Sequence, residues 1–245
     1  MVRYFIELAY NGSRYHGWQI QPGASSVQEE INRALSTLLR QDIYVVGAGR
    51  TDTGVHASFF VAHFYIECEL PEPQQVVYKL NGLLDKDIAI YKIYRVPMDK
   101  HARFSAISRT YKYYIDKTKD PFTYPFAWKA YPLPDIQAMN EACRVLFDYT
   151  DFTSFSKLHT DVKTNNCIIY EAQWEETDKQ LIFTVKANRF LRNMVRAIVG
   201  TLIDVGRGKL TPEDVRKIIE SKNRCNAGTS VPAQALFLCH IEYPE

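Results

Sequence analysis

The chain has 245 residues, a net charge of +2, 46% hydrophobic residues and 24% charged residues, values typical of a soluble globular protein with one large or two small domains. No apolar run reaches the roughly 18 residues that a transmembrane helix needs, so we expect a cytoplasmic protein without membrane contact. The five cysteines lie far apart and none has C-x-x-C spacing, which argues against a disulfide framework and against a zinc site.

The first half of the chain is predicted to mix strands and helices. Alternating or apolar patterns predict strands at residues 2–10, 43–49, 57–67 and 87–97. Helical periodicity predicts helices at residues 25–40 and 73–84. In the first of these helices we expect Ser26 as the N-cap. The expected apolar stripe consists of Val27, Ile31, Leu35 and Leu38 or Leu39.

The second half is predicted to repeat this design. After a strand at 109–115 come a helix at 134–147 and a hairpin at 167–187 that turns near residues 177–179. A helix capped by Asn188 is expected to end at Gly206, and another at 211–222 to start with Thr211 as N-cap and Pro212. Residues 233–244 predict a last strand. Without strict βαβ alternation, the pattern favours an α+β fold in two halves that meet near residues 100–108.

One stretch, GAGRTDTGVH at residues 47–56, combines glycines with charged residues between two apolar runs. On an extended backbone Arg50 and Asp52 would point to the same side. Gly47, Gly49 and Gly54 would leave the backbone bare enough for a ligand to approach. Two interpretations are open from these residues, a structural ion pair between Arg50 and Asp52 and an active site.

Basic residues gather at two further places. Arg189, Arg192 and Arg196 are spaced so that they would share one face at the start of the predicted helix, where a helix dipole disfavours cations. An anion, such as a phosphate or Asp52, would explain them; an ordinary solvated stripe is the alternative.

In HARFSAISRTYKYY, residues 101–114, the side chains of Arg109, Tyr111 and Tyr113 would share one face of a strand. This face is either a buried aromatic surface or a platform for a nucleobase.

Five blocks of the sequence resemble the TruA family of tRNA pseudouridine synthases, in the family's order and over most of the chain. They are YNGSRYHGWQIQ with SVQEEINRAL, AGRTDTGVHA, HARFSAISRTYKYYI, DFTSF and ANRFLRNMVRAIVGTLIDVG. The resemblance implies that a uridine at tRNA position 38, 39 or 40, in the anticodon stem-loop, is isomerised to pseudouridine. Its N-glycosidic bond breaks, the uracil rotates and a carbon–carbon bond forms to C5, with no cofactor and no metal.

The resemblance also implies three catalytic residues. Asp52 matches the family nucleophile, and the sequence leaves open whether it attacks C6 of the base or C1′ of the sugar. Arg196 matches the family's partner for that aspartate, and a nearby cation keeps a desolvated carboxylate ionised. Tyr111 matches the tyrosine that stacks on the target uracil, and its phenol is a candidate for proton transfer at C5.

Further residues are expected to bind the tRNA. Since a uridine within a stem must be flipped out to be reached, Arg50 is expected to hold the flipped nucleotide's phosphate or to fill the vacated space. His56, Arg189 and Arg192 are additional candidates for tRNA contacts. The resemblance implies a homodimer in which one tRNA touches both subunits.

The family fold implied by the resemblance has two ferredoxin-like (RRM-like) halves, each with a mainly antiparallel sheet, and a cleft between them. We therefore expect residues 1–103 to carry the nucleophile loop and residues 104–245 to carry the stacking tyrosine and the arginine helix. One rival interpretation is a non-catalytic tRNA-binding module in which Asp52 only forms an ion pair. A second, a methyltransferase, would need a cofactor loop in a parallel sheet, and the sequence contains no such loop.

Overall fold

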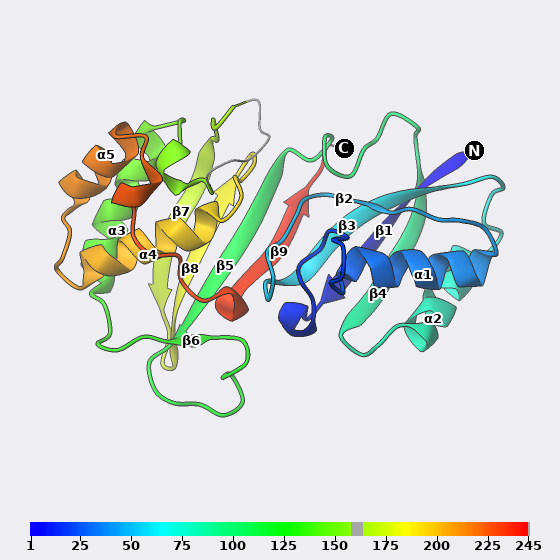
Figure 1. The fold of residues 1–245 in the computed structure, drawn as a ribbon, viewed down its shortest axis with the longest axis horizontal. Coiled ribbons are helices and arrows are strands. Elements are labelled where there is room, and N and C mark those ends of the chain that lie inside the picture. Colours follow the sequence, from blue (N-terminus) through cyan, green and yellow to red (C-terminus); the bar gives the residue numbers. More distant parts are fainter. Residues whose placement is uncertain (158–163, 245) are drawn as a thin grey trace. The chain divides into compact units, whose positions relative to one another are not determined.

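The computed structural model describes residues 1–157 and 164–244. The chain forms two compact units, which Figure 1 shows as ribbons. The first comprises Met1–Ile107 together with Leu238–Glu245, and the second comprises Ser108–Phe237. The end of the chain therefore groups with the first unit. The expected division between residues 103 and 104 would instead place it in the second unit. Each unit is described by itself.

The first unit is a mainly antiparallel sheet with two helices. Strand β1 (Val2–Tyr10) lies between β3 (His56–Ile66) and β4 (Ile88–Val96) and is antiparallel to both. The short β2 (Val46–Gly47) and β9 (Leu236–Glu242) also neighbour β3. Helix α2 (Pro73–Leu83) packs on β4 and on α1 (Val27–Leu39). Large side chains from the strands and α1 fill the core, among them Tyr4, Ile6, Leu8, Phe60, Phe64, Ile31 and Leu35.

Helix α1 confirms most of what the sequence predicts for it. Ser26 caps it by accepting a hydrogen bond from the Glu29 amide, and Val27, Ile31 and Leu35 are fully buried. The strand predicted at 43–49 shrinks to the two residues of β2, because α1 side chains take the backbone groups of residues 43–45. The Asn32 amide oxygen accepts from the Val45 amide at 2.9 Å, and Ser36 Oγ accepts from the Ile43 amide at 2.8 Å.

The second unit repeats the combination of a sheet and helices. Strand β8 (Gln180–Ala187) lies between β5 (Ser108–Asp116) and β7 (Ile169–Glu176), antiparallel to both, and the short β6 (Trp128–Lys129) runs parallel to β5. Figure 1 shows α3 (Ile136–Val145), α4 (Met194–Gly206) and α5 (Pro212–Glu220) in one layer, where α3 packs on α4, α5 and β7. The predicted hairpin turn and the Thr211 cap, part of a capping box, are confirmed.

The predicted start of α4 is wrong. The helix begins at Met194 and not after Asn188, and its N-cap is Asn193 in the left-handed conformation at φ +66°. Asn188 serves the strands instead, because its side chain accepts a hydrogen bond from the Ile168 amide at 2.8 Å. The periodic pattern continues upstream of residue 194, but residues 188–193 form the turn that leads from β8 into the helix.

Both units combine helices with mainly antiparallel strands, so the predicted mixture of strands and helices is confirmed. Among the described residues, no helix is long and apolar enough to cross a membrane.

Candidate active site

The Asp52 loop connects β2 to β3 in the first unit and closes with a tight turn. The Val55 amide donates to the Asp52 carbonyl at 3.1 Å, which fixes residues 52–55 directly before β3. Asp52 is partly exposed and Arg50 is exposed, whereas Thr51 between them is buried. The loop therefore presents the carboxylate at the surface of the unit while its backbone is anchored inside.

The segment after β1 holds the loop in place. The hydroxyls of Tyr10 and Thr51 are hydrogen-bonded at 2.9 Å. The Trp18 amide donates to the Thr51 carbonyl at 3.3 Å, and the Gly54 amide donates to the Tyr15 carbonyl at 3.4 Å. These bonds attach the loop on both sides of Asp52 to residues 10–18, so its backbone position is set by one segment that lies far from it in the sequence.

Two glycines allow these segments to approach backbone to backbone. A Cβ atom added to Gly12 would lie 2.0 Å from the Val55 carbonyl oxygen, and one added to Gly17 would lie 2.3 Å from the Thr51 carbonyl oxygen. Gly17 also has φ +90°, a conformation that side-chain-bearing residues rarely adopt. The glycines of YNGSRYHGWQIQ therefore serve the packing of the Asp52 loop.

The three glycines of the loop have different roles. A Cβ on Gly47 would lie 2.5 Å from the Trp18 indole nitrogen, so this glycine makes room for a core side chain and not for a ligand, contrary to the expectation from the sequence. Gly54 has φ +78° and serves the turn. Gly49 has no heavy atom within 4 Å of an added Cβ, so its backbone faces open space, in contrast to that of Gly47.

Arg50 bears on the choice between ion pair and active site. Among residues 1–157 and 164–244, no hydrogen bond or ion pair involves the Arg50 side chain. The structural pair of Arg50 with Asp52 is therefore not formed. An exposed guanidinium that pairs with none of the described residues, two residues from a carboxylate on an anchored loop, is suited to bind a phosphate.

In the second unit, Tyr111 and Arg109 lie on β5. Tyr111 is partly exposed, and its ring meets Phe190 edge to face at 5.1 Å between centroids. Arg109 Nη1 donates to the Asn188 carbonyl at 2.8 Å, which ties β5 to the end of β8. Tyr113, two residues further, is fully buried and donates to the Pro232 carbonyl at 3.0 Å. The face of β5 on which these side chains were predicted to lie is therefore buried at Tyr113 and partly exposed at Tyr111.

Arg196 lies in the first turn of α4 and is held by the chain that crosses it. Its Nε donates to the Val231 carbonyl at 2.7 Å, and the Val231 amide donates to the Arg196 carbonyl at 3.3 Å. Burial raises the pKa of Tyr113 above its ordinary value, and the nearby Arg196 cation opposes this. Arg196 and Tyr113 therefore share one local environment next to residues 231–232.

A family model described as tRNA pseudouridine synthase matches residues 8–105 and 142–244. The chain belongs to this family. A Bacteroides fragilis protein named tRNA pseudouridine synthase A is 59% identical over 244 residues, which cover 99% of this chain and 97% of that one. A Porphyromonas gingivalis protein of the same name is 56% identical over 247 residues, with 100% and 98% covered. A Bacillus subtilis protein of that name is 38% identical over 250 residues, with 99% of each covered.

The structure corrects the expectation for one residue of the family's loop motif. His56 is fully buried, and its Nδ1 accepts a hydrogen bond from the Gly12 amide at 3.0 Å. Its ring therefore stabilises the packing of residues 10–18 on the Asp52 loop, and a direct contact with tRNA is not supported. A histidine directly after a glycine turn gives no sign in the sequence of which way its ring points.

Arg189 and Arg192 do not lie on α4, so the argument from helical spacing fails for them. Arg189 is partly exposed and Arg192 is exposed in the turn before the helix. The Arg192 carbonyl accepts from the Lys157 amide at 3.0 Å, so the backbone of this turn is tied to a neighbouring segment. Of the three arginines, Arg196 alone is on the helix.

Nothing in the sequence pattern singles out the residues that support the site. Thr51, Tyr10 and Trp18 fix the Asp52 loop, and residues 227–232 hold Arg196. Tyr10 and Trp18 lie within a block that resembles the family, but nothing in the pattern shows that both would bind Thr51, Tyr10 through its hydroxyl and Trp18 through its amide. Among the described residues, no group of three or more His, Cys, Asp and Glu side chains could hold a metal ion.

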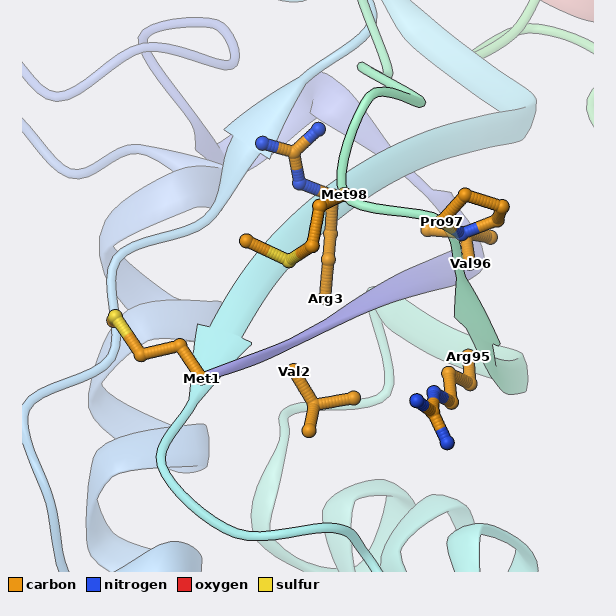
Figure 2. A pocket seen from close by; sticks show the side chains of 7 residues that line it. All are labelled: Met1, Val2, Arg3, Arg95, Val96, Pro97 and Met98. Carbon is orange, nitrogen blue, oxygen red and sulfur yellow. The ribbon is translucent and has the colours of Figure 1, made fainter.

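A pocket of the first unit lies away from the Asp52 loop. It is lined by residues 1–3 and 95–98, and Figure 2 shows the guanidinium groups of Arg3 and Arg95 pointing apart. The register explains this, because Arg3 pairs with Val96 and the two arginines therefore lie on opposite faces of the sheet. Arg3 donates to the Lys100 carbonyl and to the Tyr65 hydroxyl, and Arg95 pairs with Glu69. The pocket lies at the start of β1, whereas the Asp52 loop is bound by Tyr10 at the end of that strand.

Proposed function

We propose that this chain is a tRNA pseudouridine synthase that isomerises uridine at positions 38–40 of the anticodon stem-loop. Its membership of the family and its full-length similarity to proteins named tRNA pseudouridine synthase A support the reaction. The observation that carries the assignment of the centre is the anchored loop with a partly exposed Asp52 beside an Arg50 that makes no pair with it.

The reaction needs a nucleophile that is held in place. The bond between N1 of uracil and C1′ breaks, the ring rotates and C5 bonds to C1′. The C5 proton leaves and N1 takes up a proton, so the product is an isomer of the substrate, no electrons are gained or lost overall and no cofactor is required. We propose that Asp52 attacks C6 of the base or C1′ of the sugar and is released when the new bond has formed. An anchored loop favours this step, since a carboxylate already in position loses little entropy on attack.

The remaining site residues are proposed to bind and orient the flipped nucleotide. Tyr111 stacks on the uracil, and the edge-to-face contact with Phe190 fixes the plane of its ring. Arg196 pairs with Asp52 and keeps it ionised. Arg50 binds the phosphate of the flipped nucleotide or fills its place in the stem. Arg189 and Arg192 contact the tRNA backbone from the turn before α4, as phosphate ligands.

The arrangement of the molecule belongs to the same proposal. We propose two ferredoxin-like halves with the active-site cleft between them, the first carrying the nucleophile loop and the second carrying Tyr111 and Arg196. The enzyme acts as a homodimer in the cytoplasm, with one tRNA in contact with both subunits. The rival, a tRNA-binding module in which Asp52 only forms an ion pair, predicts that the chain binds tRNA but forms no pseudouridine.

The first test is release of tritium from tRNA labelled at C5 of uridine. We expect release by the wild type and none by Asp52→Asn, which is nearly the same size but is not nucleophilic, while both bind tRNA. Asp42→Asn is the matched control, because Asp42 is an exposed carboxylate of the same unit. Equal release by the wild type and Asp52→Asn would remove Asp52 from the mechanism. Binding without release by any of them would favour the binding module.

A further inference from the structure

Residues 227–232 form a strap across the N-terminal half of α4. The strap follows the short 3-10 turn Arg224–Asn226 and is in direct backbone contact with the helix. A Cβ on Gly200 would lie 1.9 Å from the Thr229 carbonyl oxygen, and one on Gly228 would lie 2.7 Å from the Thr201 amide nitrogen. The Gly228 amide also donates to Thr201 Oγ1 at 2.9 Å. The strap and the helix therefore cannot shift relative to each other without losing these contacts.

The end of the strap orients the Arg196 side chain. Arg196 Nε donates to the Val231 carbonyl at 2.7 Å, so one edge of its planar guanidinium is committed to the strap. The next carbonyl, that of Pro232, accepts from the Tyr113 hydroxyl at 3.0 Å. Because a guanidinium is rigid and planar, fixing Nε also fixes the direction of its two terminal nitrogens. The position of Val231 thus decides where Arg196 points.

The start of the strap is organised by another arginine. Arg224 Nη1 donates to the carbonyls of Ala227 and Gly228 at 3.3 and 3.2 Å, and Nη2 donates to Ser230 Oγ at 2.9 Å. The Asn193 side-chain amide donates to the same Ser230 oxygen at 2.6 Å. Arg224 therefore ties three residues of the strap together, and Ser230 connects them to the N-cap of α4.

We propose that Arg224 is a positioning residue for Arg196, through the strap of residues 227–232. The proposal rests on the proposed function, in which Arg196 pairs with Asp52 during pseudouridine formation. Arg224 touches neither the tRNA nor the reacting atoms. Its planar fork holds the strap in the form that presents the Val231 carbonyl to Arg196 Nε. A lysine keeps the charge but cannot bind two carbonyls and a hydroxyl with fixed geometry.

The test compares Arg224→Lys with the wild type and with Arg216→Lys. Arg216 is a matched control, because it lies in the same unit and also binds through its terminal nitrogens, to Asp148 and Tyr149. For Arg224→Lys we expect an unchanged Kd for tRNA and a single-turnover rate about 10- to 100-fold lower, as for a slightly misplaced active-site group. Arg216→Lys is expected to change neither. A normal rate for Arg224→Lys would overturn the proposal.

A double substitution separates positioning from a general loss of structure. If Arg224 acts through Arg196, then Arg224→Lys in an Arg196→Lys background should lower the rate by less than about twofold further, since the effects of two residues that act as one unit are not additive. Effects that multiply would overturn the proposal. Ser230→Ala, which removes the acceptor of Arg224 Nη2, is the second variant. It should lower the rate, and it should lower it by less in the Arg196→Lys background. It tests the proposal even if Arg224→Lys does not fold.

A readout without activity distinguishes this proposal from the function on which it rests. The Arg196 Nε–H signal in a nitrogen–proton correlation spectrum is identified by its absence in Arg196→Lys. We expect Arg224→Lys to shift or broaden it and Arg216→Lys to leave it in place. An unshifted signal would overturn the positioning role even in an active enzyme. A shifted signal in a protein that releases no tritium would support positioning while the proposed function fails.

Discussion

Gly47 and Gly49 are two residues apart in one loop but have opposite surroundings. Gly47 faces the Trp18 indole, which is buried and stacks on Phe60 at 4.2 Å between ring centroids. Gly49 faces open space. A glycine in a sequence shows only that a side chain is missing, and the reason for its absence depends on residues that the fold brings near. This is why the role expected for Gly47 was wrong.

The two glycines should therefore respond differently to alanine. Gly47→Ala is expected to destabilise the protein by about 1–3 kcal/mol, because the new methyl group overlaps a core ring that cannot move away. Gly49→Ala should change stability by about 0.5 kcal/mol or less and lower activity instead, since the methyl group would project into the open space of the Asp52 loop, where we propose that the nucleotide approaches. Urea unfolding and tritium release measure both effects. A stable, active Gly47→Ala protein would contradict the Trp18 contact.

His63 makes the stability of the first unit sensitive to pH. Burial, with smaller effects from His101 and Arg3, lowers the pKa of His63 to about 4 from 6.5. Its Nδ1 accepts from the Ala102 amide at 3.2 Å. Between pH 6.5 and pH 4 the unfolded chain is protonated at this site while the folded chain is not. The unfolded state then binds more protons, so stability must fall as the pH falls through this window.

Replacing His63 should flatten this dependence. The shift corresponds to about 3 kcal/mol if it is fully expressed. We expect His63→Asn, which retains an acceptor for the Ala102 amide, to lose less stability than the wild type between pH 7 and pH 4.5. His16→Asn is the control, because His16 is exposed. Urea unfolding at several pH values is the measurement, and an unchanged slope for His63→Asn would contradict the buried neutral ring.

At the level of elements, periodicity predicted most helices and strands but not every boundary. Helix α1, the 177–179 turn and the capped start of α5 follow from local signals, an N-cap, a turn and an apolar stripe. The errors at β2 and α4 have another cause. The backbone groups of residues 43–45 are taken by α1 side chains, and residues 188–193 are bound to segments distant in sequence. Local patterns contain no information about such partners.

The contact between α1 and residues 43–45 can be tested with Asn32→Ala. The substitution leaves the amide of fully buried Val45 without its acceptor, which should cost about 1–3 kcal/mol. Alanine favours a helix more than asparagine does, so a loss of stability would come from the lost hydrogen bond. Arg33→Ala, an exposed neighbour on α1, is the control. Thermal unfolding measures the difference, and a gain in stability for Asn32→Ala would contradict this contact.

Each of the two units contributes candidate site residues. The two units differ in which segments of the chain form them. The second is a continuous stretch, whereas the first consists of two pieces separated by the entire second unit. The closing piece makes several contacts with the opening one. The Ile107 amide donates to the Glu242 carbonyl at 2.8 Å, the Tyr243 hydroxyl donates to the Ala102 carbonyl at 2.6 Å, and the Tyr243 ring lies 5.3 Å from that of Phe5. The sequence predicted the last strand but not the unit to which it belongs.

Truncation after Phe237 should therefore weaken one unit more than the other. Loss of residues 238–245 removes most of β9 next to β3 and the Tyr243 contacts. We expect faster amide hydrogen exchange in β1 and β3, with β7 and β8 little changed, because local stability follows local contacts. Mass spectrometry of exchanged peptides provides the measurement. Equal acceleration in both units would show that the terminal strand stabilises the whole chain and not the first unit alone.

The divided first unit also sets an order of events during synthesis. A ribosome makes the Asp52 loop early, but the strand that completes its sheet is translated only after the whole second unit. Domains made from one continuous stretch can fold as they emerge, so the part bearing Tyr111 and Arg196 is able to fold first. An unfinished chain has Asp52 but an incomplete sheet around it. From this topology we expect the second unit to be completed before the first, against the direction of translation.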